Sequence, residues 1–286
     1  YNDMLSVTIF PTILSNLMNL DPEWVFKLLI PLLFSFVPLG LYHLWENQFG
    51  SKVALASGFF FMAEQTFYTE MPGLVRQMVA ELFFVLLFIV LLSKERKSKK
   101  LLCFTVFGTA LIMSHYSLSL IFLFFLLFAW LLPFVIRRRV YFTKVTLTMI
   151  VLFSVLMFSW YIYTSRSTTF NSTLHYRNYV VSPLSEWSNP ASRGQVVGRG
   201  LGLESAPSMW NTVSRGFAYF TQFLIVFGFI GVIARRVKLG VDPEYFHFTL
   251  PSVVLLVALI AVPGLSTTID MTRFYHILLF FLAPLC

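Results

Sequence analysis

The sequence predicts an all-α, polytopic integral membrane protein. Of its 286 residues, 57% are hydrophobic, 33 are Phe and only 12% are charged. Soluble domains carry about 25% charged and about 45–50% apolar residues, and the mean hydropathy of +0.77 lies far on the apolar side. Apolar runs also recur along the whole chain between short clusters of charge and turn residues. These observations exclude a soluble globular domain.

The first element is an apolar stretch over residues 4–20 that is interrupted by Pro11, Ser15 and Asn16. A broken segment of this length predicts a helix that lies in the membrane interface, at the end of an outer loop, and does not cross. The next apolar run contains Pro31 and Pro38, each of which removes a helical hydrogen bond and bends the helix.

Cutting the chain at charge clusters and turn residues gives about nine transmembrane helices. Several of them are only about 15 residues long, whereas a helix needs about 20 residues to cross the membrane. The uncharged block 101–136 is divided at 114–117, because an unbroken helix of this length would measure about 54 Å. The predicted spans cover 24–45, 52–67, 76–93, 101–115, 117–136, 145–164, 216–234, 249–262 and 274–286.

Four parts follow from these spans. Residues 1–23 end the first outer loop, 24–164 form a six-helix membrane unit, 165–215 form an extracytoplasmic loop, and 216–286 form three further helices, the last of them truncated. Because the chain starts at Tyr1 without a signal sequence and stops within an apolar run, we expect it to be a piece of a longer protein.

The orientation follows from the cations. Segments 94–100, 137–144 and 235–238 contain 12 of the 21 Lys and Arg residues. Alternating spans place all three clusters on one face, which the positive-inside rule makes cytoplasmic. The N-terminus and the loop 165–215 are then extracytoplasmic in a multi-pass protein of the cell membrane. Basic residues beside spans indicate contact with anionic lipid, so no nucleic acid is expected as a partner.

The long loop and the two cysteines carry no diagnostic motif. In the loop 165–215, the GRGLG stretch at 198–202 follows no predicted strand and lacks a closing Gly-Lys-Ser/Thr, so it does not predict a nucleotide site. Asn171 begins a glycosylation sequon on the predicted outer side. Cys103 and Cys286 lie in apolar runs, which predicts neither a disulfide framework nor a zinc site.

The ionisable residues on the outer face are the most informative, since a charge at the bilayer centre costs about 2.5–3.5 kcal/mol on insertion scales. One interpretation is structural: ion pairs tie helices together, and Gln77 bonds Glu81 one turn away. The other is a site for a phosphorylated lipid head group, with Arg as phosphate donors and carboxylates as ligands of Mg²⁺ or Mn²⁺. The residues concerned are Glu64, Glu70, Arg76, Glu81, His115, Tyr116, Asp270, Arg273 and His276.

The stretches TFYTEMPGLVRQMVAELFF and MSHYSLSLIFLF, in this order after KVALASGFFF, carry a resemblance. The chain resembles an uncharacterised group of archaeal multi-spanning membrane proteins. More distantly, it looks like the GT-C superfamily of polyprenyl-phosphate-sugar-dependent glycosyltransferases. The resemblance covers most of 1–136 and, weakly, 272–276. It implies a GT-C-like helical bundle.

The resemblance also implies roles for particular residues. The first-loop catalytic acid of GT-C enzymes would lie upstream of Tyr1, because Asp3 stands too close to the interfacial helix, so we expect this piece alone to be inactive. Glu70 and Arg76 match the acid and Arg of the next outer turn, and Arg273 would contact donor phosphate. The full hypothesis assigns catalysis to Glu70, Glu81 and His115, substrate binding to Arg76, Tyr116, Arg273 and His276, and metal to Glu70 and Asp270.

The leading functional hypothesis is a glycosyltransferase that moves a sugar from a polyprenyl-phosphate-linked donor to a glycan or protein acceptor on the outer face. His115 would orient or protonate the leaving group, although a histidine that merely caps a helical hairpin explains it as well. A transporter or flippase is the first alternative, but the charges lie near the ends of the spans and no internal repeat is seen. A non-enzymatic membrane assembly protein is the second.

Overall fold

The computed structural model describes residues 4–136, 144–164, 194–202, 208–234, 242–262, 265 and 270–286. Within these ranges the chain is helical and contains no strand, which confirms the predicted all-α class. The helical elements are α1 (Ile9–Met18), α2 (Pro22–Trp24), η1 (Val25–Leu29), α3 (Ile30–Phe34), α4 (Phe36–Phe49), α5 (Ser51–Ala63), η2 (Thr66–Glu70), η3 (Met71–Gly73), α6 (Val75–Leu92), α7 (Lys97–Ser114), α8 (Tyr116–Ile136), α9 (Leu147–Ser159), η4 (Trp160–Thr164), α11 (Gln195–Gly200), α12 (Met209–Ile233), α13 (Pro243–Ala261), α15 (Met271–Leu282) and η7 (Ala283–Leu285).

Six helical segments of the described chain are long and apolar enough to cross a membrane. The predicted count of nine is therefore not confirmed, because the segments at 52–67, 101–115 and 274–286 fold as helices that are shorter or begin with several lysines. The six segments are Pro22–Phe49, Val75–Leu92, Tyr116–Val135, Leu147–Thr164, Met209–Ile233 and Pro243–Ala261.

The first span is broken where its prolines predict. A π-helical turn, η1, comes directly before α3, which carries Pro31 in its first turn. A second break falls at Ser35, three residues before Pro38, whose missing N–H leaves a carbonyl of the preceding turn without its helical donor. The Ser35 N–H lies 3.0 Å from the Pro31 oxygen and 3.2 Å from the Leu32 oxygen. The prolines therefore divide this span into short pieces.

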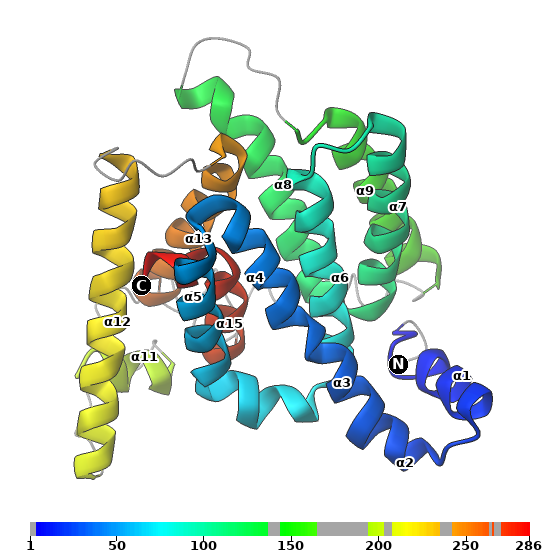
Figure 1. The fold of residues 1–286 in the computed structure, drawn as a ribbon, viewed down its shortest axis with the longest axis horizontal. Coiled ribbons are helices and arrows are strands. Elements are labelled where there is room, and N and C mark those ends of the chain that lie inside the picture. Colours follow the sequence, from blue (N-terminus) through cyan, green and yellow to red (C-terminus); the bar gives the residue numbers. More distant parts are fainter. Residues whose placement is uncertain are drawn as a thin grey trace. The chain divides into compact units, whose positions relative to one another are not determined.

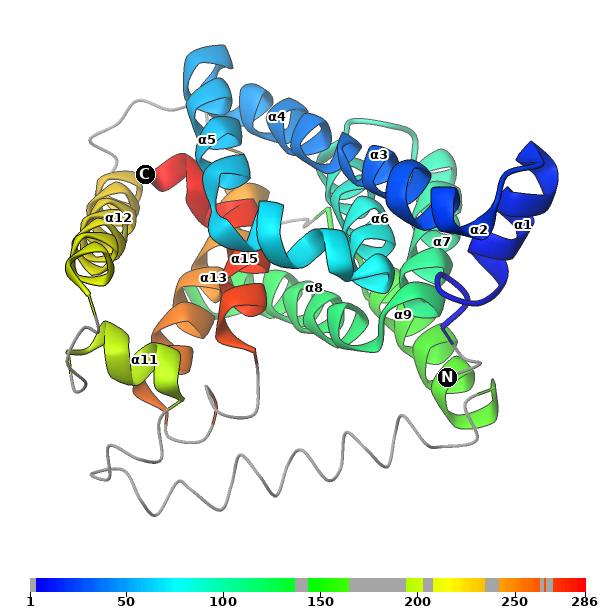
Figure 2. The same ribbon diagram turned by 90° about the horizontal axis from the view of Figure 1, so that it is seen from below.

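The described chain forms two compact units. Unit 1 contains residues 1–170 and 241–248, and unit 2 contains residues 171–240 and 249–286, so α13 contributes its first residues to one unit and the rest to the other. In unit 1, α6 and α7 are antiparallel neighbours joined by a short link (Figure 1), and Figure 2 shows α7 beside α9.

The core of unit 1 is built from phenylalanine rings. Phe88 of α6 packs edge-to-face against Phe122 of α8 at 5.4 Å between ring centroids and against Phe248 of α13 at 4.9 Å. Phe84 and Phe125 complete this group, and all five rings are buried. Edge-to-face pairs contribute about 0.5–1.5 kcal/mol each beyond burial. In a membrane, where lipid is as apolar as the protein core, such specific contacts determine how α6, α8 and the start of α13 pack.

Unit 2 contains a long helix that packs closely against the C-terminal segment. Few residues of α12 are buried, and a row of its phenylalanines, including Phe220 and Phe227, is exposed as expected for a helix that faces lipid. At Gly228 a Cβ atom would lie only 2.2 Å from the Leu285 carbonyl oxygen. A small residue at this position lets the two backbones touch, as is common between helices in membranes.

Candidate functional site

Glu81 is the most deeply buried charge of the predicted site. It lies on α6, six residues after the helix begins, and its side chain is 0% exposed. Six residues of helix amount to about 9 Å of depth. The Gln77 amide donates a hydrogen bond of 3.0 Å to Glu81 Oε1, which confirms the predicted bond between these residues. A carboxylate at this depth makes the start of α6 a candidate functional site.

Glu70 and Arg76 lie on the two sides of the turn that leads into α6. Glu70 ends η2, and Arg76 stands in the first turn of α6, with the short helix η3 between them. Both side chains are half-buried, so both remain reachable from outside the bundle. The structure therefore places a carboxylate and a guanidinium at the same end of unit 1 as the buried Glu81.

His115 forms the junction between α7 and α8. It has an extended backbone, and the Leu118 N–H donates to its Nδ1 at 3.4 Å while the Ser119 hydroxyl donates to its backbone oxygen at 2.9 Å. The ring is buried and stacks on Tyr116 with centroids 5.6 Å apart. If Nδ1 accepts, the neutral ring carries its proton on Nε2. The helix-capping interpretation of His115 thus has a geometric basis.

Other segments of unit 1 meet the α7–α8 junction. The Leu5 N–H donates to the Met113 oxygen at 2.9 Å, and the Ser6 hydroxyl donates to the Ser114 oxygen at 3.1 Å. The Tyr161 hydroxyl, from η4, donates to the Ile112 oxygen at 2.7 Å. These bonds satisfy carbonyls that the end of α7 leaves open. They hold the N-terminal segment and η4 at the end of the unit that also carries Glu81.

Three of the predicted residues, Asp270, Arg273 and His276, belong to unit 2. Asp270 is the N-cap of α15, where it accepts from the Arg273 N–H and, at 2.8 Å, from the Thr272 hydroxyl. Its other oxygen pairs with Arg273 Nε at 3.0 Å, and both side chains are well exposed. His276 is buried one turn further along. The pair of Asp270 and Arg273 is the contact that a spacing of three residues allows on one side of a helix.

No group of three His, Cys, Asp or Glu residues in the described part of the chain is arranged to hold a metal ion. Asp270 already uses its carboxylate for the cap of α15 and for Arg273. Mg²⁺ or Mn²⁺ at Glu70 and Asp270 therefore stays a prediction. Most of the loop 165–215, with its sequon at Asn171, and Asp3 lie outside the described residues.

A second polar cluster, which the sequence reasoning missed, lies at the opposite end of unit 1. Lys144 forms an ion pair with Asp242, donates from Nζ to the Leu92 oxygen at 3.1 Å, and donates from its backbone N–H to Glu244 Oε1 at 2.5 Å. Lys100 Nζ donates to the Leu91 oxygen at 2.8 Å. We call Lys100, Lys144, Asp242 and Glu244 the lysine–carboxylate cluster.

The cluster brings together the flanks of the three basic segments. Burial lowers the pKa of Lys100, and the neighbouring Lys144 lowers it further, while Glu244 and Asp242 act in the opposite direction. Glu244 Oε2 lies 3.7 Å from His247 Nδ1, and both atoms are buried. A signal was present in the sequence, because Asp-Pro-Glu at 242–244 is a helix-start pattern placed directly after a basic segment.

The fold and its buried charges define a helical, multi-pass membrane protein. Over residues 99–286, well over half of its length, the chain matches the family described as Predicted membrane protein (DUF2206), and it belongs to that family. No glycosyltransferase family matches, so the distant likeness to GT-C enzymes stays a prediction. No curated protein and no solved structure matches the chain.

Proposed function

We propose that this chain is part of a membrane glycosyltransferase that takes a sugar from a polyprenyl-phosphate-linked donor and transfers it to a glycan or protein acceptor. One observation carries the proposal. Glu70 and Arg76, which are half-buried and therefore reachable, stand at the end of the bundle where Glu81 is fully buried beneath them. Buried ionisable groups in membrane helices are retained for function more often than for stability.

Arg76 is suited to bind the donor phosphate. Its guanidinium can give two parallel hydrogen bonds to phosphate oxygens, and a half-buried position strengthens them relative to bulk water. In unit 2, Arg273 is the residue that the likeness to GT-C enzymes assigns to donor phosphate, and its Nε already pairs with Asp270 at 3.0 Å. Negative charge develops on the leaving phosphate during transfer, so these groups would stabilise the transition state.

Glu70 is the general base of the proposed reaction. Its carboxylate takes the proton from the acceptor hydroxyl while the acceptor oxygen bonds to the anomeric carbon. The bond from that carbon to the phosphate oxygen breaks, the electron pair leaves with the polyprenyl phosphate, and the sugar is transferred with inversion. In the whole step, Glu70 gains one proton, and the bond between the anomeric carbon and the phosphate oxygen is replaced by a bond to the acceptor oxygen.

Glu81 and His115 are the buried members of the proposed site in unit 1. Glu81 is held by Gln77 at 3.0 Å and fixes the start of α6, on which Arg76 stands. In unit 1, His115 would protonate or orient the leaving phosphate from Nε2, with Tyr116 stacked on its ring. The substrate-binding role of His276 in unit 2 stays a prediction from the sequence. The assignment of metal binding to Glu70 and Asp270 stays a prediction from the sequence, and no step of the proposed reaction depends on a metal.

The test uses the full-length protein in membranes that contain a radiolabelled polyprenyl-phosphate sugar. We expect Glu70→Gln to reduce transfer by about 100-fold or more, the usual range for loss of a general base. Arg76→Ala should reduce it by a similar factor through lost phosphate binding. Arg76→Lys, which keeps the charge but loses the forked geometry, should recover part of the activity.

Glu95→Gln is the matched control, because Glu95 is an exposed carboxylate at the opposite end of unit 1, where it pairs with Lys99. It removes the same charge without touching the proposed site. Full transfer by correctly folded Glu70→Gln and Arg76→Ala proteins would refute the proposed site.

A further inference from the structure

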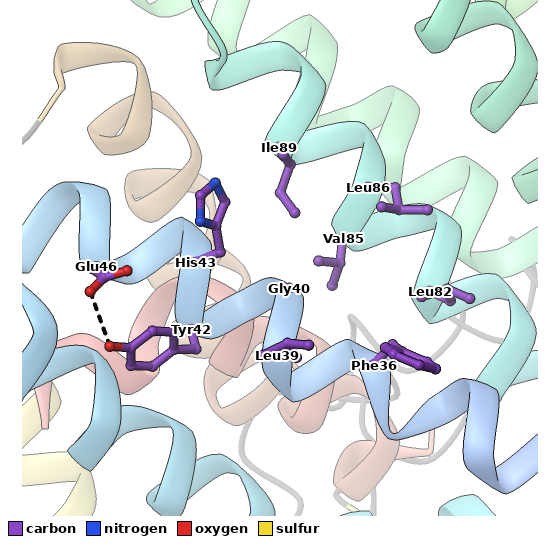
Figure 3. A pocket seen from close by; sticks show the side chains of 10 residues that line it. All are labelled: Phe36, Leu39, Gly40, Tyr42, His43, Glu46, Leu82, Val85, Leu86 and Ile89. Atoms are coloured by element: carbon purple, nitrogen blue, oxygen red, sulfur yellow. Dashed lines mark hydrogen bonds between the residues drawn. The ribbon is translucent and has the colours of Figure 1, made fainter.

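A groove of about 470 Å³ runs between α4 and α6 in unit 1 (Figure 3). Its apolar part is lined by Phe36 and Leu39 of α4 and by Leu82 and Leu86 of α6. Phe36 and Leu39 are exposed, and both helices belong to candidate spans, so this surface faces the hydrocarbon of a bilayer. Its size lies within the range of about 300–1,000 Å³ that small-molecule sites occupy.

The bottom of the groove is formed by a close approach of the two helices. Gly40 has no side chain, and a Cβ atom there would lie 2.5 Å from Val85 Cγ1 on α6. In Figure 3, Gly40 lies between Leu39 and His43 on α4, opposite Val85. The missing side chain lets Val85 approach the backbone of α4, and Leu39 and Leu86 line the groove above this contact.

The polar end of the groove carries a negative charge. The Tyr42 hydroxyl donates a hydrogen bond of 3.0 Å to Glu46 Oε1, and the exposed His43 lies one turn from it. None of the ten lining residues is Lys or Arg. His43 is the only basic side chain of the lining and carries no permanent charge, so the Glu46 carboxylate favours a cationic group and disfavours a phosphate that carries the only charge of its ligand.

The length of the groove matches one leaflet. From Phe36 to Glu46, α4 advances by about 15 Å, which is half of the about 30 Å of a hydrocarbon core. The polar residues stand close to Phe49, where the span Pro22–Phe49 ends, and the apolar residues lie deeper along the span. A lipid has the same order, with its head group at the interface and its chain toward the middle.

We propose that this groove binds one phospholipid whose head group carries a primary ammonium, such as phosphatidylethanolamine. The ammonium would pair with Glu46, and one chain would lie along Leu39, Leu82 and Leu86. The site is separate from the transfer site proposed at the start of α6, and its negative end is unsuited to a polyprenyl phosphate. It would act as a structural lipid site of unit 1.

Native mass spectrometry of the purified, delipidated protein tests the head group. The probes are phosphatidylethanolamine and phosphatidylglycerol with identical acyl chains. An exposed ion pair changes a binding constant by about threefold to fivefold, so we expect the wild type to prefer phosphatidylethanolamine by that factor. Glu46→Gln should bind both lipids equally, whereas Glu95→Gln, which removes a carboxylate paired with Lys99, should keep the preference.

Equal binding by the wild type, a preference for phosphatidylglycerol, or an unchanged preference in Glu46→Gln would overturn the proposal. A second measurement locates the chain. Phosphatidylethanolamine with a photoreactive diazirine in its acyl chain should crosslink to 36–46 or 82–89 at least as strongly as to any other peptide. The exposed apolar surface of α12 serves as the internal reference, and stronger crosslinking there would show ordinary contact with bilayer lipid instead of a site.

Discussion

At the scale of single residues, Lys144 connects more of unit 1 than any other side chain in the lysine–carboxylate cluster. Its ammonium pairs with Asp242 of the α13 start and also donates to the Leu92 oxygen at the end of α6. The side chains of the pair are about three-quarters buried, at 27% and 25% exposure. One cation therefore neutralises a carboxylate and caps the negative end of a helix.

We expect Lys144→Met to destabilise unit 1. The substitution keeps the length of the side chain but leaves Asp242 without its cation and Leu92 without its donor, which should cost about 1.5–3 kcal/mol. Lys99→Met is the control, since Lys99 forms an exposed i, i+4 pair with Glu95 that contributes about 0.5 kcal/mol or less. Thermal unfolding in detergent compares the two. Equal melting temperatures for both variants would show that the cluster has no stabilising role.

Residue-scale prediction from sequence succeeded for contacts within one helix. The Gln77–Glu81 bond and the Asp270–Arg273 pair follow from spacing alone, because neighbours three or four positions apart share a helix face. The ion pair between Lys144 and Asp242 joins residues 98 positions apart in the sequence. Sequence periodicity does not predict such a contact. The basic segment that contains Lys144 is explained by membrane topology without any ion pair.

At the scale of helices, the close contact between α12 and the C-terminal segment depends on Gly228. We expect Gly228→Ala to destabilise unit 2 by about 1–3 kcal/mol, because the new methyl group would meet the Leu285 carbonyl, a backbone group that cannot rotate away. In a position without such a contact, the same substitution favours a helix by about 0.5–1 kcal/mol.

Gly216 provides that position within the same helix, since a Cβ atom there meets nothing within 4 Å. Gly216→Ala should therefore leave α12 equally or more stable. The measurement is the resistance of α12 to proteolysis together with the melting temperature in detergent. If both substitutions act alike, the packing of α12 against Leu285 does not matter for stability.

Helix starts and ends show what sequence can and cannot predict at this scale. The predicted division of 101–136 at His115 is confirmed, since α7 ends at Ser114 and α8 begins at Tyr116. The division was predictable because a helix longer than the bilayer has to be interrupted, and the polar residues show the position of the interruption. By contrast, α13 begins at Pro243, six residues before the predicted span at 249. Cutting at charges excluded Glu244, although an Asp before a Pro is a strong helix start. In the fold, the Glu244 carboxylate accepts a hydrogen bond from the Lys144 backbone N–H.

At the scale of the whole molecule, the flanks of the basic segments converge on one end of unit 1. Lys100 and Lys144 both donate to carbonyls at the end of α6, and Lys144 also pairs with Asp242, which follows the segment 235–238. The predicted alternation of nine spans would place the three segments on one face, and the described flanks agree with that arrangement. Glu70 and Arg76 lie at the opposite end of α6. The charges proposed to stabilise unit 1 and the charges proposed to act in sugar transfer are therefore separated along this helix.

This separation predicts how the protein is oriented, since short loops rich in Lys and Arg stay in the cytoplasm. In a background with Cys103→Ser and Cys286→Ser, a membrane-impermeant maleimide should label Thr69→Cys in intact cells. It should label Ser98→Cys only after the membrane is permeabilised. Both positions are exposed and lie at opposite ends of α6, so each serves as the control for the other. Labelling of Ser98→Cys in intact cells would place Glu70 and Arg76 on the cytoplasmic side, and an extracytoplasmic transfer reaction at that end would then be excluded.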